Sequence, residues 1–237
     1  MNFQVDAWGG RVSQRGMSYK FLFPGLGFAL TILGLLHGGW FCLAFWVAAD
    51  FFILGLAHGR GWHRIFGKRP DGALSWWSWL LFLPLLLLTW TIYHVLRRFS
   101  REPACNTVSD TLVVGRRLLP AEVDGQFDNY VDLTAEFTEP SPIRRAPSYR
   151  SFPILDGAAP TPEALRAAVA SLRPGRTFVH CAQGHGRTAL FALAMLLSSG
   201  EAQTVEAGLR RLTRVRPAIR LSRAQRRCIE AFAQRAR

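Results

Sequence analysis

Cysteine is scarce in this sequence of 237 residues, and the four copies are not paired. Cys42, Cys105, Cys181 and Cys228 form no C-x-x-C pattern and no regular spacing. This arrangement argues against a disulfide framework and against a zinc site. Unpaired cysteines fit a reducing compartment. No internal repeat is visible in the sequence.

Lysine and tryptophan are missing from most of the chain. Both Lys residues lie before residue 69, and all eight Trp residues lie before residue 91. From residue 101 onward every basic residue is Arg, with 20 Arg against 13 acidic residues. The net charge of +13 favours an anionic partner, such as a phosphorylated substrate or an anionic lipid. Nucleic acid is not expected, because the Arg residues are scattered and not interleaved with aromatic residues.

Long runs without charge are confined to the first part of the chain. In residues 21–57, Asp50 and His37 are the only strongly polar side chains. At about 1.5 Å per residue this run exceeds one crossing of a ~30 Å hydrocarbon core, so a break at Gly38 and Gly39 predicts two spans. Residues 73–96 form a third run with Trp near both ends, as interfacial belts require. Buried helices of a soluble protein are the alternative, and no signal-peptide cleavage pattern is present.

Three basic flanks surround these runs, namely the tail before residue 21, the loop 58–72 and residues 97–101. They cannot all be cytoplasmic if the chain crosses the membrane three times. Either Pro84 breaks the last run into a re-entrant or surface-lying pair, or one flank departs from the rule. Within the second span, Asp50 either lines a cavity or marks a helix end. His58 and His63 could bind a metal, although we expect no metal site.

The composition divides the chain into four parts. We expect a basic tail over residues 1–20, a transmembrane helical region over 21–98 with two to three spans, a polar linker over 99–110, and a soluble domain over 111–237. In the last part, strands are predicted at 111–118, 130–137, 151–155 and 176–181. Helices are predicted at 161–175, which Thr161 caps, then at 188–200, around 205–212 and at 222–234. This alternation indicates an α/β fold with a central, mainly parallel sheet flanked by helices.

The stretch FVHCAQGHGRTALF, residues 178–191, carries the clearest chemistry. Its pattern predicts a strand that ends at Cys181, a loop of five residues and a helix that begins near Arg187. Gly184 and Gly186 allow successive backbone N–H groups to point inward and cradle an anion beside the helix N-terminus. Arg187 adds a planar fork for two phosphate oxygens. The same donors favour the thiolate form of Cys181, which is the nucleophilic form.

These residues resemble the cysteine-dependent protein phosphatase signature H-C-x5-R-[S/T], matched at His180, Cys181, Arg187 and Thr188. The form CAQGHGRT looks most like the dual-specificity branch. VSDTLVVGRRL, YVDLTAEF, FPILDGAAPTPEAL and RVRPAIRLSRAQRRCIEAF are similar, in order, to further parts of that branch. The resemblance covers roughly residues 108–235 and does not reach the N-terminal hundred residues.

The resemblance implies a role for each matching residue. Cys181 would be the nucleophile, Arg187 the phosphate clamp, Thr188 a group that assists thiolate release, and His180 a group that tunes the thiolate. The phosphate-binding loop would comprise Ala182, Gln183, Gly184, His185 and Gly186, with His185 facing either substrate or solvent. Asp156 would be the general acid, and Asp110, Asp124, Asp128 and Asp132 are competitors that we expect to cap turns or face water. No metal or cofactor is needed, because Arg and backbone donors carry the charge stabilisation.

The sequence therefore predicts a membrane-anchored phosphomonoesterase with its catalytic domain in the cytoplasm, where sulfur stays reduced. The phosphate-binding loop, residues 182–186, carries no fixed charge. This narrowly favours phosphotyrosine, phosphoserine or phosphothreonine in proteins as the substrate, whereas the membrane tether favours lipid head-group phosphates. One alternative is a catalytically silent phosphate-binding scaffold. Another is a transporter built on the N-terminal spans. The oligomeric state is not predicted.

Overall fold

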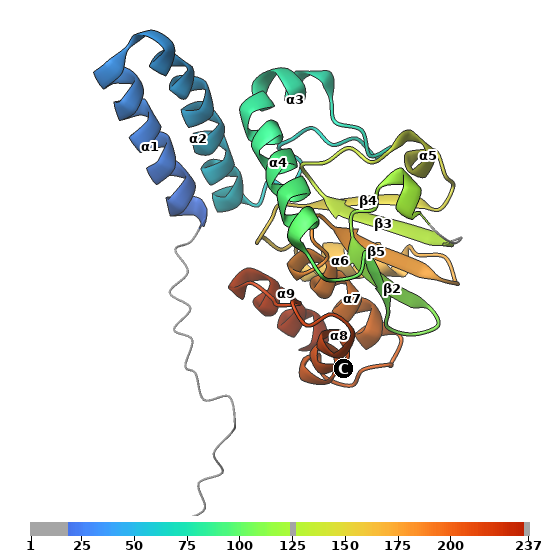
Figure 1. Cartoon of the computed structure of the whole chain (residues 1–237). Helices are drawn as coiled ribbons and strands as arrows, with labels where there is room; N and C mark the ends of the chain where they lie inside the picture. Colours follow the sequence, from blue (N-terminus) through green and yellow to red (C-terminus); the bar gives the residue numbers. More distant parts are fainter. Residues whose placement is uncertain (1–18, 124–126, 235–237) are drawn as a thin grey trace, which may run out of the picture.

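The computed structural model describes residues 19–123 and 127–234, so Asp124 lies outside the described residues. Figure 1 shows a helical hairpin at one end, a second helical pair beside it, and an α/β domain. These parts follow one another along the chain in that order.

The hairpin consists of α1 (Tyr19–His37) and α2 (Ala44–Arg60), joined by a short 3₁₀ helix (Gly39–Leu43). Gly38 and Gly39 have φ angles of 59° and 52°, a region that favours glycine, so the break falls where the sequence predicted it. By length and composition, α1 and the continuous helical stretch from Gly39 to Arg60 can each cross a membrane. Only 11% and 28% of their most apolar windows are buried, which argues against the alternative of buried helices in a soluble core.

The third apolar run is not one continuous helix. It divides into α3 (Trp76–Leu81) and α4 (Leu83–Phe99), with Pro84 in the first turn of α4. Proline is well tolerated there but not in a helix interior. The predicted break near Pro84 is therefore present, whereas a re-entrant or surface-lying position of the pair stays a prediction. The later part of α4 contacts the α/β domain, where the Tyr93 hydroxyl donates to the carbonyl of Arg117 at 2.8 Å.

A five-stranded sheet forms the centre of the α/β domain. The strands are β1 (Cys105–Thr107), β2 (Leu112–Arg116), β3 (Asn129–Thr134), β4 (Tyr149–Ile154) and β5 (Thr177–Cys181). Their order is β1-β2-β5-β3-β4, and only the β1 pairing is antiparallel. The mainly parallel α/β fold is thus confirmed, although β1 occupies part of the predicted linker.

Four helices complete this domain (Figure 1), namely α6 (Pro162–Ala170), α7 (Gly186–Ser198), α8 (Val205–Val215) and α9 (Arg223–Gln234). The Thr161 hydroxyl accepts a hydrogen bond from the amide of Ala164, as an N-cap should. Helix α6 ends at Ala170, earlier than the end that Gly175 was expected to follow. Helix α7 packs between the sheet and the other helices and is apolar on nearly all sides. A one-turn helix, α5 (Ser141–Arg144), and a 3₁₀ turn (Pro120–Glu122) lie in the connections.

The helical region and the α/β domain share buried structure. Leu54, Ala57 and Phe66 pack in one apolar cluster with Ala135 and Leu155 of the α/β domain. Moreover, Lys68 is only 3% exposed, and its ammonium group lies 2.5 Å from the carboxylate of the fully buried Asp132. Two expectations are corrected here. Asp132 accepts a hydrogen bond from the amide of Thr134, but it does not face water and is buried in an ion pair. Lys68 is not a free charge of a basic flank.

Candidate active site

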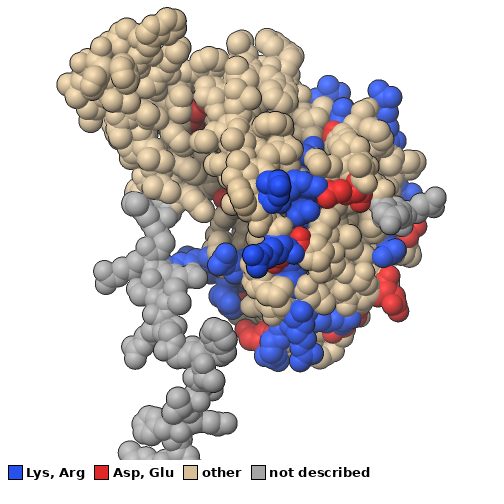
Figure 2. Space-filling view, in the orientation of Figure 1, with Lys and Arg blue, Asp and Glu red and all other residues tan. Residues whose placement is uncertain are grey.

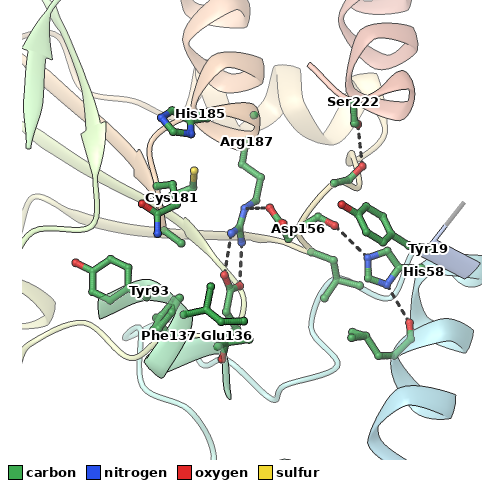
Figure 3. A pocket seen from close by; sticks show the side chains of 18 of the residues that line it. Tyr19, His58, Tyr93, Glu136, Phe137, Asp156, Cys181, His185, Arg187 and Ser222 are labelled. Atoms are coloured by element: carbon green, nitrogen blue, oxygen red, sulfur yellow. Dashed lines mark hydrogen bonds and ion pairs between the residues drawn. The ribbon is translucent and has the colours of Figure 1, made fainter. Parts of the chain in front are cut away.

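The nucleophile candidate lies where the central strand β5 meets the buried helix α7. Cys181 is the last residue of β5, and α7 begins at Gly186 after a loop of four residues. The Cys181 side chain lines a cavity together with Arg187 and Asp156, as Figure 3 shows. The predicted strand–loop–helix arrangement is therefore present.

Gly184 permits the tight path of this loop. Its φ angle is 75°, and a Cβ atom there would lie 2.4 Å from the backbone carbonyl carbon and oxygen of Gly115. No L side chain fits at that distance. The loop therefore lies against strand β2 as closely as backbone atoms allow.

Arg216 fixes the orientation of the loop peptides. Its guanidinium is 2% exposed and donates to the carbonyls of Gln183 and Gly184, both at 2.9 Å. Since these carbonyls point toward Arg216, the N–H groups of the following residues are turned the opposite way, as an anion cradle requires. Sequence reasoning did not single out Arg216, which was only part of the R-P stretch within the resemblance.

His185 lines the cavity, and its side chain is paired with a carboxylate instead of facing only solvent. Its Nε2 atom lies 2.7 Å from the carboxylate of Glu102, which also lies 3.3 Å from Arg216. Although partial burial acts in the opposite direction, His185 and Arg216 lower the pKa of Glu102. Glu102 therefore stays ionised and ties the loop to the segment that follows α4.

Arg187 is held in a fixed orientation by a residue that sequence reasoning missed. Both carboxylate oxygens of Glu136 accept hydrogen bonds from Arg187, at 2.9 and 2.8 Å, and the carbonyl of Ile154 accepts another at 3.0 Å. Burial alone would disfavour the charged guanidinium, yet Glu136 and Asp156 raise its pKa above the ordinary value. Three hydrogen bonds from the two terminal nitrogens thus orient the fork. Nε makes no hydrogen bond within the described residues and points toward the cavity side, where its neighbour is the carboxylate of Asp156.

Asp156 lies beside this guanidinium, with one carboxylate oxygen 3.4 Å from Nε of Arg187. Its side chain is 78% exposed, so it can exchange protons with water and substrate. Of the four competitors, Asp110 is exposed, Asp128 accepts from the amide of Arg176 in a turn, and Asp132 is buried in an ion pair. None of these three lines the cavity.

The loop that carries Asp156 is supported from two sides. From the helical region, Nε2 of His58 lies 3.1 Å from the carbonyl of Asp156, and Nε2 of His63 lies 3.1 Å from that of Ala159. From the C-terminal side, the Ser222 hydroxyl donates to the carbonyl of Gly157 at 2.8 Å (Figure 3). His58 and His63 therefore bind backbone oxygens of this loop, and burial lowers the pKa of His63.

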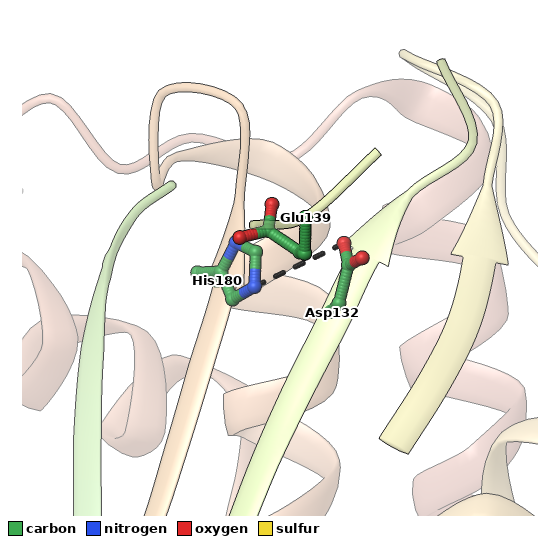
Figure 4. Close-up of side chains that lie close together, drawn as sticks. All are labelled: Asp132, Glu139 and His180. Atoms are coloured by element: carbon green, nitrogen blue, oxygen red, sulfur yellow. Dashed lines mark ion pairs between the residues drawn. The ribbon is translucent and has the colours of Figure 1, made fainter. Parts of the chain in front are cut away.

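Asp132, Glu139 and His180 lie close together, and all three are buried (Figure 4). Their ligand atoms lie within 4.8 Å of one another, a spacing that could suit a metal ion. However, Lys68 pairs with Asp132, and Arg117 lies 2.7 Å from Glu139. Two cations of the protein already neutralise these carboxylates, so a metal would have to displace Lys68.

His180, which precedes Cys181 in the chain, and Thr188, which follows Arg187, are both fully buried. Burial lowers the pKa of His180 to about 4, which leaves the imidazole neutral near pH 7. The Thr188 hydroxyl, in the first turn of α7, has no hydrogen-bond partner within the described residues. A group in that position can serve a bound substrate or the sulfur, as predicted, and its role stays a prediction.

The cavity above these residues has a volume of about 610 Å³. The loop residues Ala182, Gln183, His185 and Gly186 contribute to it, together with Cys181, Glu136, Asp156 and Arg187. Side chains from α1, α2 and α4 line it as well, among them Phe23, Phe51, Leu54, Leu88, Ile92 and Leu96. The site can therefore hold an anion against the loop and an apolar group beside it.

Comparison with known proteins identifies the fold of the α/β domain. No protein-family model matches the chain, and neither does any curated protein sequence. Among solved structures, Tk-PTP in its active form is similar at 21% identity and a TM-score of 0.50, covering 56% of this chain and 98% of that one. PTPMT1 in complex with PI(5)P is similar at 14% identity and a TM-score of 0.50, covering 56% and 97%. The chain thus contains a domain with the dual-specificity and tyrosine phosphatase fold.

Proposed function

We propose that the protein is a membrane-anchored phosphomonoester hydrolase that acts through a cysteinyl-phosphate intermediate. One arrangement supports this proposal above all. Cys181, Arg187 and Asp156 line one cavity, and Nε of Arg187, which no hydrogen bond engages within the described part of the chain, lies 3.4 Å from the carboxylate of Asp156. They lie over a loop whose carbonyls Arg216 turns outward. Nucleophile, anion clamp and acid are thus within reach of a single phosphate group.

In the first step the Cys181 thiolate attacks phosphorus, and a bond from Sγ to phosphorus forms as the bond to the leaving oxygen breaks. Asp156 donates its proton to that oxygen. Arg187 and the loop N–H groups stabilise the charge on the equatorial oxygens of the transferring group. The chemistry needs a positioned acid because an alkoxide is a poor leaving group.

In the second step a water molecule attacks phosphorus, and Asp156, now ionised, accepts the proton of that water. The bond from sulfur to phosphorus breaks, which releases inorganic phosphate and regenerates the thiolate. Glu136 takes no proton in either step, because both of its oxygens are engaged by Arg187.

The helical hairpin provides the anchor. Tyr19 and His58 lie at the same end of the hairpin, with ring centroids 5.4 Å apart, and this end adjoins the catalytic domain. If only α1 and α2 cross the bilayer, all three basic flanks lie on the catalytic side, as the positive-inside rule requires for the cytoplasm. In this topology α3 and α4 lie at the membrane surface. The face of the hairpin shown in Figure 2 is almost free of charged residues, whereas basic residues gather on the α/β domain.

The test uses the full-length protein in detergent with a chromogenic aryl phosphate and an alkyl phosphate. Cys181→Ser should abolish turnover of both substrates, because the serine hydroxyl, unlike a thiol, is not ionised at neutral pH and is a poor nucleophile. Asp156→Ala should slow the alkyl phosphate by about 10²- to 10⁴-fold and the aryl phosphate far less, since only the poor leaving group needs the proton.

Asp110→Ala is the matched control, since this exposed carboxylate lies outside the cavity and its loss should leave both rates unchanged. Turnover that persists in Cys181→Ser would overturn the proposed chemistry. Complete inactivity of the wild-type protein toward every phosphomonoester would favour the silent scaffold instead.

A further inference from the structure

The cavity above Cys181 has two walls of opposite character. One wall is the phosphate-binding loop with Arg187. The other, here called the apolar wall, consists of Phe51 and Leu54 from α2 and of Leu88, Ile92 and Leu96 from α4. The apolar wall belongs entirely to the helical region, outside the part of the chain that resembles phosphatases.

The α4 part of the apolar wall is an ordered stripe and not a set of core residues. Leu88, Ile92 and Leu96 follow at intervals of four, so they share one face of the helix. They are 45%, 46% and 50% exposed although they line the cavity. Apolar side chains that stay this exposed at the edge of a site are typical of a surface that binds an apolar ligand or lipid.

Few cations face the cavity. Besides Arg187, the lining includes Arg220 and no Lys, and the loop residues 182–186 carry no fixed charge. This number of positive charges suits one phosphate group and leaves a multiply phosphorylated head group poorly matched. A peptide substrate would leave its backbone groups unpaired against an apolar wall, which is costly.

The position of the cavity agrees with an amphiphilic substrate. It lies at the end of the hairpin that holds Tyr19 and His58, and both residues line it. If α1 and α2 cross the bilayer, this end lies at the level of the lipid head groups. An acyl chain in contact with α2 and α4 then runs from the site into the hydrocarbon region, without having to leave the membrane entirely.

We infer, on the basis of the phosphatase activity proposed above, that the substrate is a membrane lipid with a single terminal phosphomonoester, whose acyl chain lies against the apolar wall. The uncharged loop alone narrowly favoured a phosphoprotein. The apolar wall was not predicted, because its residues come from segments that are distant in the chain from the loop. The acyl contacts add binding energy that a water-soluble phosphomonoester cannot obtain.

The test compares substrates that differ only in acyl chains. Dihexanoyl phosphatidate and glycerol 3-phosphate, both water-soluble, are assayed with the full-length protein in detergent, beside a phosphotyrosyl peptide and an aryl phosphate. We expect kcat/KM for dihexanoyl phosphatidate to exceed that for glycerol 3-phosphate and for the peptide by at least about 100-fold. Dioleoyl phosphatidate in vesicles should also be hydrolysed.

A pair of matched variants tests the wall itself. In Leu88→Gln/Leu96→Gln the ratio of kcat/KM for dihexanoyl phosphatidate to that for the aryl phosphate should fall at least 10-fold. Leu87→Gln/Val95→Gln changes residues of similar exposure, 53% and 49%, that do not line the cavity, and should leave this ratio unchanged. If this ratio is the same in both double variants, or if the peptide is the preferred substrate, the lipid inference is overturned. Continued hydrolysis of the aryl phosphate would then show that the phosphatase proposal still holds. Failure with every substrate would instead remove the proposed phosphatase function.

Discussion

At the scale of single residues, the buried charges and neutral groups around Cys181 determine how the site responds to change. Arg187 is useful to an oxyanion only while its fork keeps one orientation. Glu136 provides that orientation through two hydrogen bonds, and no motif in the sequence indicated it. The two residues are 51 positions apart, so no local pattern can connect them.

Glu136→Gln is expected to lower kcat/KM about 10- to 100-fold, because the neutral amide holds only part of the guanidinium geometry. Steady-state kinetics with the aryl phosphate measure this effect. Glu122→Gln, which loses ion pairs with Arg97 and Arg116 outside the cavity, is the control. An unchanged kcat/KM in Glu136→Gln would show that Arg187 needs no such support.

Because His180 is buried, we predict that the free energy of unfolding decreases in acid. Its pKa is lowered from 6.5 to about 4, because burial disfavours the charged imidazole. Below pH 6.5 the unfolded chain takes up a proton that the folded protein refuses, so stability present above that pH is lost as the pH falls toward 4. This linkage amounts to about 3 kcal/mol at about 1.4 kcal/mol per pH unit.

Urea unfolding in detergent at pH 7 and pH 4.5, of the wild type and His180→Asn, measures this term. The stability advantage of the wild type over the variant should shrink toward acid pH. Parallel pH curves for the two proteins would show that His180 does not titrate in this way.

At the scale of elements, the loop between β5 and α7 depends on backbone contact that only glycine allows. Gly184→Ala places a Cβ atom 2.4 Å from the Gly115 carbonyl, so the loop must move and its N–H groups lose their alignment. We expect kcat/KM to fall at least about 100-fold. Activity assays and thermal unfolding of the same preparation report both effects.

Gly200→Ala is the matched control for this prediction. Gly200 has nearly the same φ angle, 74°, but nothing lies within 4 Å of its added Cβ atom. The control thus carries the backbone strain alone, about 1 kcal/mol of lost stability, and should keep its activity. Equal loss of activity in both variants would contradict the proposed role of close contact.

Sequence patterns predicted elements better than they predicted contacts. The break at Gly38 and Gly39, the cap at Thr161 and the turn after Cys181 each depend on neighbouring residues, and each is present. Lys68 and Arg216 were not anticipated. Lys68 pairs with Asp132, 64 residues away, and Arg216 donates to the carbonyl of Gly184, 32 residues away. Such long-range contacts of buried cations leave no periodic pattern in a sequence.

At the scale of the whole molecule, the proposed topology can be tested with cysteines that the chain already has. Cys42 is exposed at the turn of the hairpin, and Cys105 is exposed in the catalytic domain. Variants that keep only Cys42 or only Cys105 are treated with a membrane-impermeant maleimide in intact cells. We expect labelling of Cys42 from outside, and labelling of Cys105 only after the membrane is permeabilised.

Labelling of Cys105 from outside intact cells would place the catalytic domain on the opposite side. Labelling of neither cysteine before permeabilisation would indicate that the hairpin does not expose its turn across the membrane. Labelling of both would show that the topology is mixed.

The ion pair between Lys68 and Asp132 has a consequence for how the molecule comes into being. Asp132 belongs to the catalytic sheet, but its counter-charge is made earlier on the ribosome, between the hairpin and α3. A fragment that starts after α4 would bury an unbalanced carboxylate, a defect of about 3–5 kcal/mol, comparable to the whole stability of many small domains. If the protein acts as proposed, a chain whose helical hairpin does not insert lacks a correctly placed Lys68, and its α/β domain should fold poorly and show little activity.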